Sequence, residues 1–211
     1  MRSVLIILLC CISVSAHAAS ASAELDQFLQ GLTSFTADFR QRLLDEDKRL
    51  VETSEGQLFV KRPGSFRWNY THPYPQEIVG ARNHVWVYDS ELEQVSVKAI
   101  DDALGNSPAL LLTTTRPLAE LFAIKDLGEK NGINWVELRP LKEDAAFNAF
   151  NIGMVRGSLQ VMELKDNFGQ LTQLSFGKLV RNPELDDKLF EFVPPAGADV
   201  VGDVPPKASS N

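Results

Sequence analysis

The chain has 211 residues, 44% of them hydrophobic and 23% charged, and its formal net charge at pH 7 is −7. This length suits one domain with a core of its own, and the acidic balance argues against nucleic acid or an anionic lipid surface as a partner, because both select basic proteins. Acidic and basic residues are interspersed along the sequence, so most charges are expected on an ordinary solvated surface.

The first 18 residues have the pattern of an export signal. Arg2 precedes an apolar run over residues 4–14, and Ala16-His17-Ala18 matches a signal-peptidase site. We expect cleavage after Ala18 and a mature single domain over residues 19–211. The apolar run is too short to stay in a bilayer as an anchor, so the mature protein is expected to be exported without stable membrane insertion.

Both cysteines, Cys10 and Cys11, lie inside this predicted signal segment. The mature chain would then have no disulfide and no cysteine ligand for a metal, and its stability would depend on its hydrophobic core. Leu9 occupies the position before Cys10 at which a lipoprotein signal requires a small residue. We therefore expect a mature N-terminus without a lipid.

One helix and then a long series of strands are predicted. The helix covers residues 22–32, and its apolar side chains at helical spacing are Leu25, Phe28, Leu29 and Leu32. From Phe35 to Leu43 apolar residues alternate with polar ones, which indicates a strand with one wet face. Further alternating segments cover residues 55–61, 65–70, 76–80, 84–89, 94–98, 126–130, 133–138, 147–152, 158–164 and 171–176.

About 11 strands with few helices predict a mainly β protein of the α+β class. A twisted antiparallel sheet of this size curls, so we expect an incomplete antiparallel barrel. Residues 105–124 break the strand pattern and predict two short helical segments, the second starting near Pro117 with Leu118 and Leu121 apolar. From about Pro194 the chain is rich in Pro, Gly and Ser and is predicted to be a flexible tail.

Large apolar side chains on these strands indicate a cavity. In the segment VKRPGSFRWNY, residues 60–70, three rings occupy alternate positions, which taken alone indicates core packing. The whole set is large for a sheet with little helix to fill its hollow, and a curved sheet lined in this way encloses space for an apolar ligand. The set comprises Phe35, Phe39, Leu58, Phe66, Trp68, Val79, Trp86 and Phe150.

Arg62 stands at the edge of the strand that ends near Lys61. Such a residue is commonly an exposed cation that contributes little to stability. Its planar guanidinium can also bond several backbone carbonyls, so an arginine at the mouth of a barrel can hold the carbonyl end of a helix that lies across the opening. Both interpretations stay open from the residues alone.

Catalytic signatures are missing from the predicted mature sequence. It has only His72 and His84 as imidazoles, and it contains none of the G-x-S-x-G, H-E-x-x-H, P-loop or dinucleotide-binding patterns. We therefore expect no enzyme activity, no cofactor and no metal. An envelope hydrolase acting on lipids is the weaker alternative, and it would depend on one of the two histidines.

Several stretches in this order, behind a signal segment, resemble the LolA family of periplasmic outer-membrane lipoprotein carriers. They are LTSFTADFRQ, GQLFVKRPGSFRWNY, HVWVYDSELEQVSV, ALGNSPALLL and FEFVPPAGADVV, which together span nearly the whole predicted mature chain. The resemblance implies a half-barrel with a helical lid that carries triacylated lipoproteins across the periplasm. It also implies an inner-membrane ABC transporter that loads the carrier and an outer-membrane receptor that unloads it.

The resemblance implies roles for particular residues. Arg62 would lock the lid, and Phe66 and Trp68 would line the acyl-chain cavity. The expected cavity residues are then Phe35, Phe39, Leu58, Phe66, Trp68 and Trp86, and the expected lid residues are Leu110, Leu111, Leu112, Leu118 and Leu121. We expect a monomer, and the alternative within the same fold is a lipid-anchored receptor or a lipoprotein-sensing protein.

Overall fold

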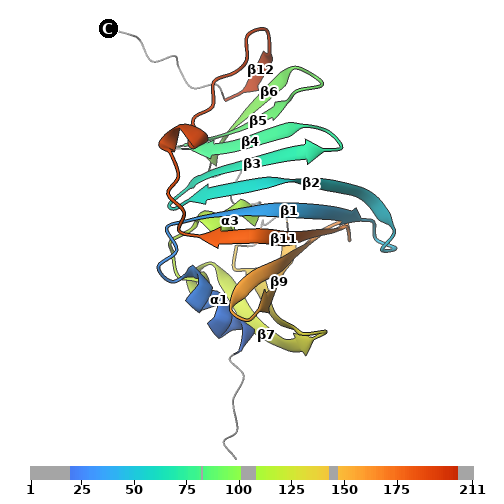
Figure 1. Ribbon diagram of the computed structural model, residues 1–211. Helices are drawn as coiled ribbons and strands as arrows, with labels where there is room; N and C mark the ends of the chain where they lie inside the picture. Colours follow the sequence, from blue (N-terminus) through green and yellow to red (C-terminus); the bar gives the residue numbers. More distant parts are fainter. Residues whose placement is uncertain (1–19, 82, 101–107, 143–146, 204–211) are drawn as a thin grey trace, which may run out of the picture.

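The computed structural model describes residues 20–81, 83–100, 108–142 and 147–203. This part of the chain forms one curled sheet of 12 strands with two α-helices and two short 3-10 helices (Figure 1). None of these helices is long and apolar enough to cross a bilayer. The helices are α1 (Ala21–Leu29), α3 (Pro108–Thr113), η1 (Leu118–Glu120) and η2 (Asp187–Phe190).

The strands follow one another mostly as a meander. They are β1 (Ser34–Leu44), β2 (Leu50–Lys61), β3 (Ser65–His72), β4 (Gln76–Ala81), β5 (His84–Asp89), β6 (Gln94–Ala99), β7 (Phe122–Lys130), β8 (Ile133–Pro140), β9 (Phe147–Val155), β10 (Ser158–Asp166), β11 (Leu171–Arg181) and β12 (Asp199–Gly202).

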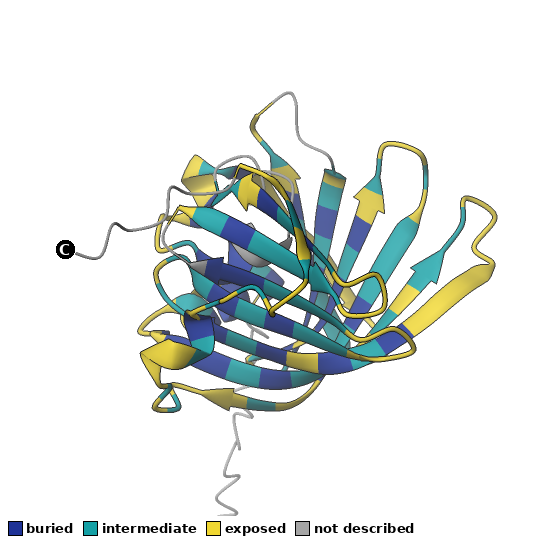
Figure 2. Ribbon diagram, turned by 90° about the horizontal axis from the view of Figure 1, so that it is seen from above, coloured by how far each residue is buried: buried dark blue, intermediate teal, exposed yellow. Residues whose placement is uncertain are grey.

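Strand β1 joins two halves of the sheet. The spatial order is β12-β6-β5-β4-β3-β2-β1-β11-β10-β9-β8-β7, so β1 pairs with β2 on one side and with β11 on the other. All neighbours are antiparallel except β12 and β6, which are parallel. Strands β12 and β7 end the order without pairing to each other in the described chain, and the sheet curls but stays open (Figure 2). The predicted incomplete antiparallel barrel is confirmed.

The structure corrects two local predictions. The second predicted helical segment is only the single turn η1, and Phe122 begins β7. The predicted tail contains a strand, β12, which pairs with the edge strand β6. The backbone N–H of Asp199 donates to Glu93 O at 2.9 Å, and that of Asp203 donates to Val97 O at 3.1 Å. A four-residue strand of this kind depends on a partner edge far away in sequence. The predicted signal segment, residues 1–18, lies outside the described residues.

The concave face of the sheet is apolar. Directly paired residues share a face, and one row across the sheet runs through Phe35, Val60, Phe66, Gly80 and Val85. The main buried cluster lies on this face, and two helices cover it. Helix α1 contacts β7 to β10, whereas α3 contacts β2 and β3.

A second, smaller apolar cluster lies on the convex face, where the C-terminal segment crosses the sheet. The Phe192 ring lies 5.7 Å from the Trp86 ring and 6.2 Å from the Tyr88 ring, and η2 contacts β3 and β4. Arg67 holds this segment: its Nε donates to Leu189 O at 2.6 Å and its Nη2 donates to Glu191 O at 3.1 Å. The guanidinium also pairs with Glu77 at 2.6 Å.

Replacement of Arg67 by Met is expected to loosen the C-terminal segment. The change removes two charge-assisted bonds to backbone carbonyls, which contribute roughly 2 kcal/mol or more together. Limited proteolysis should then cut within residues 189–203 several times faster than in the wild type. The matched control is Arg40→Met, since among the described residues Arg40 pairs only with the exposed Glu55 and its own side chain is 64% exposed. Equal cutting of the Arg67 and Arg40 variants would contradict the role of Arg67.

Candidate functional site

Five of the six predicted cavity residues form one wall on the concave face. Phe35, Phe39, Leu58, Phe66 and Trp68 all lie on β1, β2 or β3, and none is more than 5% exposed. The Phe39 ring meets the Trp68 ring edge to face at 5.4 Å and the Tyr70 ring at 5.0 Å. The Trp68 and Tyr70 rings are stacked at 6.4 Å.

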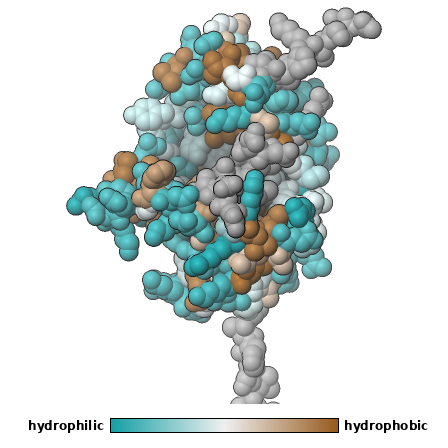
Figure 3. Space-filling model, turned by 180° about the vertical axis from the view of Figure 1, so that it is seen from behind, coloured by the Kyte–Doolittle hydropathy of each residue, from teal (hydrophilic) through white to brown (hydrophobic). Residues whose placement is uncertain are grey.

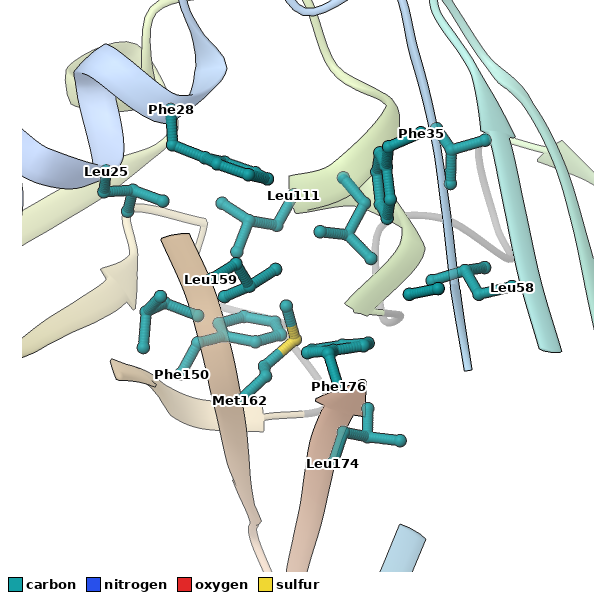
Figure 4. Packing of buried hydrophobic residues seen from close by; sticks show 14 of the residues in the cluster. Leu25, Phe28, Phe35, Leu58, Leu111, Phe150, Leu159, Met162, Leu174 and Phe176 are labelled. Atoms are coloured by element: carbon teal, nitrogen blue, oxygen red, sulfur yellow. The ribbon is translucent and has the colours of Figure 1, made fainter. Parts of the chain in front are cut away.

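The wall continues across β1 into the other half of the sheet. Phe39 is paired with Phe176 on β11, and Leu174 is paired with Met162 on β10. Figure 4 shows side chains of both halves directed toward one another from β1, β2, β9, β10 and β11. The concave face therefore presents a continuous apolar wall. None of these second-half residues was among the six predicted cavity residues, although Phe150 belonged to the larger set of apolar strand residues.

Trp86 does not belong to this wall. Its cross-strand partner is Val79, whose own partner is Arg67, so Trp86 lies on the convex face beneath Phe192. Its predicted place in the cavity is therefore wrong. In β5 both alternating sets are apolar, so the two-residue period does not decide which set faces inward. Only the pairing to β4 shows that Val85 and Val87 occupy the concave face.

Leucines of α3 fill the space in front of the wall. Leu111 and Leu112 are at most 2% exposed, and Figure 4 shows Leu111 among Phe28, Phe35 and Leu159. The end of α3 is joined to the β2–β3 turn, because Gly64 N donates to Thr113 O at 3.4 Å. Leu118 in η1 is also buried, and the half-buried Leu121 packs against the same cluster. The side chain of Leu110 lies outside the described part of the chain.

Arg62 binds the C-terminal end of α1. Its Nη1 donates to Leu29 O at 3.1 Å and makes a longer contact of 3.5 Å with Leu32 O. Helices end with unpaired carbonyls and a partial negative charge, which a guanidinium satisfies. Burial lowers the pKa of Arg62, and its Nε has no hydrogen-bond partner among the described residues. The structure thus brings Arg62 to the carbonyl end of a helix, but among the described residues this helix is α1 and not the predicted lid segment with Leu111 and Leu112.

A second arginine, Arg181, holds the same helix end from the other side of β1. Its Nη2 donates to Phe28 O at 2.8 Å and to Gln30 O at 3.1 Å, and its guanidinium lies 5.3 Å from the centre of the Phe28 ring. The adjacent Asn182 donates to Gly31 O at 3.0 Å. Arg181 was not predicted. It comes near Arg62 only because β11 pairs with β1, where Arg181 is opposite Phe35.

The N-terminal half of α1 is also fixed to the sheet. The Glu24 carboxylate accepts hydrogen bonds from Asn134 Nδ2 at 2.6 Å and from Gly157 N at 2.8 Å. Ser22 donates to Asp126 from its backbone N–H at 2.8 Å and from its hydroxyl at 2.7 Å. These bonds connect α1 to β7, to β8 and to the turn between β9 and β10. Helix α1 therefore covers the apolar wall as an element that is held at both ends.

Beyond Trp68 the concave face becomes polar. A pocket of about 280 Å³ is lined by Gln41, Glu52, Ser54, Tyr70, Pro73, Tyr74, Gln76, Asp89 and Glu91. The Tyr70 hydroxyl donates to Gln41 Oε1 at 3.0 Å, and Ser54 donates to Glu52 at 2.6 Å. Burial, together with the negative charge of Glu52, raises the pKa of Tyr70 above its ordinary value, so the hydroxyl stays protonated.

The face of the molecule opposite to that of Figure 1 carries separate hydrophobic patches among hydrophilic residues, as far as its described part shows (Figure 3). The wall residues themselves are buried. The two histidines are not brought together. His72 ends β3 and His84 begins β5, and these two strands run in the same direction on either side of β4, so the histidines lie at opposite ends of the strands. No group of three His, Cys, Asp or Glu residues in the described ranges has the arrangement of a metal site.

Comparisons with known proteins agree with this geometry. The family model described as "Outer membrane lipoprotein carrier protein LolA" matches residues 30–193. A protein of Methylococcus capsulatus named outer-membrane lipoprotein carrier protein is 43% identical over 196 residues, which cover 93% of this chain and 94% of the relative. A protein of the same name from Dechloromonas aromatica is 41% identical over 188 residues, with 89% and 90% covered.

A solved structure shares the fold at low sequence identity. The crystal structure of an "uncharacterized conserved protein" from Thermus thermophilus superposes with a TM-score of 0.55 at 14% identity, covering 86% of this chain and 99% of that chain. This likeness shows that the two chains share their fold.

Proposed function

Because the chain belongs to the LolA family of outer membrane lipoprotein carrier proteins, we propose that it carries lipoproteins across the periplasm with their acyl chains bound against the concave face. The observation that supports this most directly is the continuous apolar wall beneath two helices. The proposed contacts with the acyl chains come from Phe35, Phe39, Leu58, Phe66 and Trp68.

The covering leucines explain how such a carrier can release its cargo. Burial of one CH2 group contributes about 0.8 kcal/mol, so a long acyl chain taken from water contributes on the order of 10 kcal/mol. Several chains in an open apolar hollow would be bound almost irreversibly. If acyl chains instead displace Leu111 and Leu112 from the wall, the net affinity is a difference between two burials and becomes small enough to reverse.

The partners of this proposed carrier follow from its task. An inner-membrane ABC transporter would supply the work that displaces the lid leucines during loading. An outer-membrane receptor would accept the acyl chains in a better pocket. In this scheme Leu110, Leu111, Leu112, Leu118 and Leu121 belong to the lid, Arg62 and Arg181 hold the cover closed, and the protein acts as a monomer without catalysis.

Two leucine-to-alanine variants test the proposal because they are expected to act in opposite directions. Leu111→Ala shortens a lid side chain, destabilises the closed empty state, and should tighten the binding of a triacylated lipopeptide roughly tenfold. Leu174→Ala shortens a wall side chain and should weaken the same binding roughly tenfold. Both residues are about 1% exposed, which makes the pair matched in burial.

The measurement is a fluorescence titration of purified mature protein with the lipopeptide, with its unacylated peptide as the control ligand. Circular dichroism checks that each variant is folded at the assay temperature. No binding of the acylated peptide by the wild type would contradict the carrier proposal. Weaker binding by both variants would contradict the proposed displacement of the lid while leaving an acyl-binding wall.

A further inference from the structure

One buried hydrogen-bond donor on the concave wall has no acceptor. The Trp68 indole Nε1 is buried and has no hydrogen-bond partner among the described residues, although Trp68 is only 5% exposed. A buried donor without an acceptor costs about 1–3 kcal/mol, and native structures seldom leave one without a reason. The other described atoms of this kind belong to Arg62, Asn69 and Asn151.

Those three other atoms lie outside the concave wall. Arg62 is at the end of α1, as described above. Asn69 is paired with Gln57 and Glu77, and Asn151 with Glu137 and Glu163, so both belong to polar rows of the convex face. The Trp68 indole is therefore the one donor of this group within the proposed acyl-binding surface.

Trp68 lies at the boundary between the apolar and the polar part of the concave face. Its own row across the sheet contains Leu58, Ile78 and Val87. The next row toward the polar end contains Tyr70 and Gln76, and both of these residues line the pocket of about 280 Å³. A ligand with an apolar and a polar half would thus place the junction of the two halves at Trp68.

The chemistry of an acylated cysteine fits this boundary. Two of its fatty chains are joined to the glyceryl group by esters, whose carbonyl oxygens accept hydrogen bonds and donate none. The tryptophan N–H donates and does not accept. An ester carbonyl at the junction would satisfy the indole, the chains would lie on the apolar wall, and the peptide would pass into the polar pocket.

We propose that Trp68 selects acyl-linked cargo by donating a hydrogen bond from Nε1 to an ester carbonyl of the bound lipid. This inference rests on the proposed carrier function, since it needs acyl chains on the concave wall. It adds a polar contact at the indole Nε1. It also predicts that the binding affinity depends on how the chains are linked to the glyceryl group, in addition to their length.

Two synthetic lipopeptides test the proposal: they carry the same peptide and the same chain lengths, one with glyceryl esters and the other with glyceryl ethers, which lack the carbonyl. The wild type should bind the ester form about fivefold to tenfold more tightly, as expected for one buried hydrogen bond. Trp68→Phe should lose this preference and bind both forms alike. Trp86→Phe, on the convex face, should keep the preference.

A spectroscopic readout covers the case in which Trp68→Phe fails to fold. In the wild type, the indole N–H resonance of Trp68, assigned by comparison with the Trp86→Phe and Trp135→Phe variants, should move downfield with the ester lipopeptide and stay nearly unchanged with the ether form. Equal affinity of the wild type for the two forms, or the same resonance shift with both, would overturn the role of Trp68. Failure of the wild type to bind either form would instead contradict the carrier function itself.

Discussion

A methyl group added at Gly56 is expected to destabilise the protein by about 3 kcal/mol or more, because there is no room for a Cβ at this position. An ideal Cβ would lie 1.9 Å from the backbone oxygen of Asn69 and 2.9 Å from Phe39 Cε1. Gly56 is paired with Phe39 on one side and with Tyr70 on the other, so it lies within the aromatic cluster of the wall. Relief of the clash would require β2 and β3 to separate or Phe39 to move.

Thermal unfolding of Gly56→Ala checks this expectation. For a chain of this size, about 3 kcal/mol corresponds to a fall in the unfolding temperature of roughly 6–12 °C. Gly177→Ala is the matched control, because a Cβ at Gly177 on β11 meets no atom within 4 Å. An unfolding temperature of the Gly56 variant equal to that of the control would show that the pairing of β2 and β3 is looser than described.

Loss of both Arg62 and Arg181 is expected to release the C-terminal end of α1 from the sheet. The two guanidinium groups donate to carbonyls of Phe28, Leu29 and Gln30, and together they should contribute about 3 kcal/mol to holding α1 closed. This corresponds to roughly a hundredfold in the equilibrium for opening of the helix. Each single Leu variant should give a smaller change, with Arg62→Leu the larger because Arg62 is the more buried of the two.

Hydrogen exchange measures this opening directly. The backbone amides of residues 24–30 should exchange faster in the double variant, while those of β1 and β2 stay protected. Arg139→Leu removes the same charge from an exposed pair with Glu137 and serves as the control. Unchanged exchange in α1 would contradict the role of the two arginines.

The same change has a consequence for the proposed carrier. A cover that closes less readily favours the loaded state, so Arg62→Leu should still take up a lipopeptide but should transfer it to acceptor vesicles or to a receptor more slowly than the wild type. Arg181→Leu should show the same direction with a smaller effect. Normal transfer by the double variant would remove the arginines from the release step even if they stabilise the helix.

Much of the fold could be predicted from local pattern. The period of two identified all eleven strands from β1 to β11, and the spacing of Leu25 and Phe28 identified α1. Five of the predicted cavity residues share one face of the sheet, and the clean alternation of β1 and β3 between apolar and polar residues indicates that face from the sequence. The resemblance to the carrier family, carried by particular stretches, is confirmed by the family model and by the relatives.

The sequence by itself therefore determined the strands β1 to β11, the helix α1 and the apolar character of one sheet face, because each of these depends on residues close together in the chain. Only the tertiary structure decided that Trp86 faces outward, that β12 extends the edge of β6, and that Arg181 joins Arg62 at the end of α1. These three features depend on pairing between segments far apart in sequence. Alternation along one strand carries no information about which strand will lie beside it.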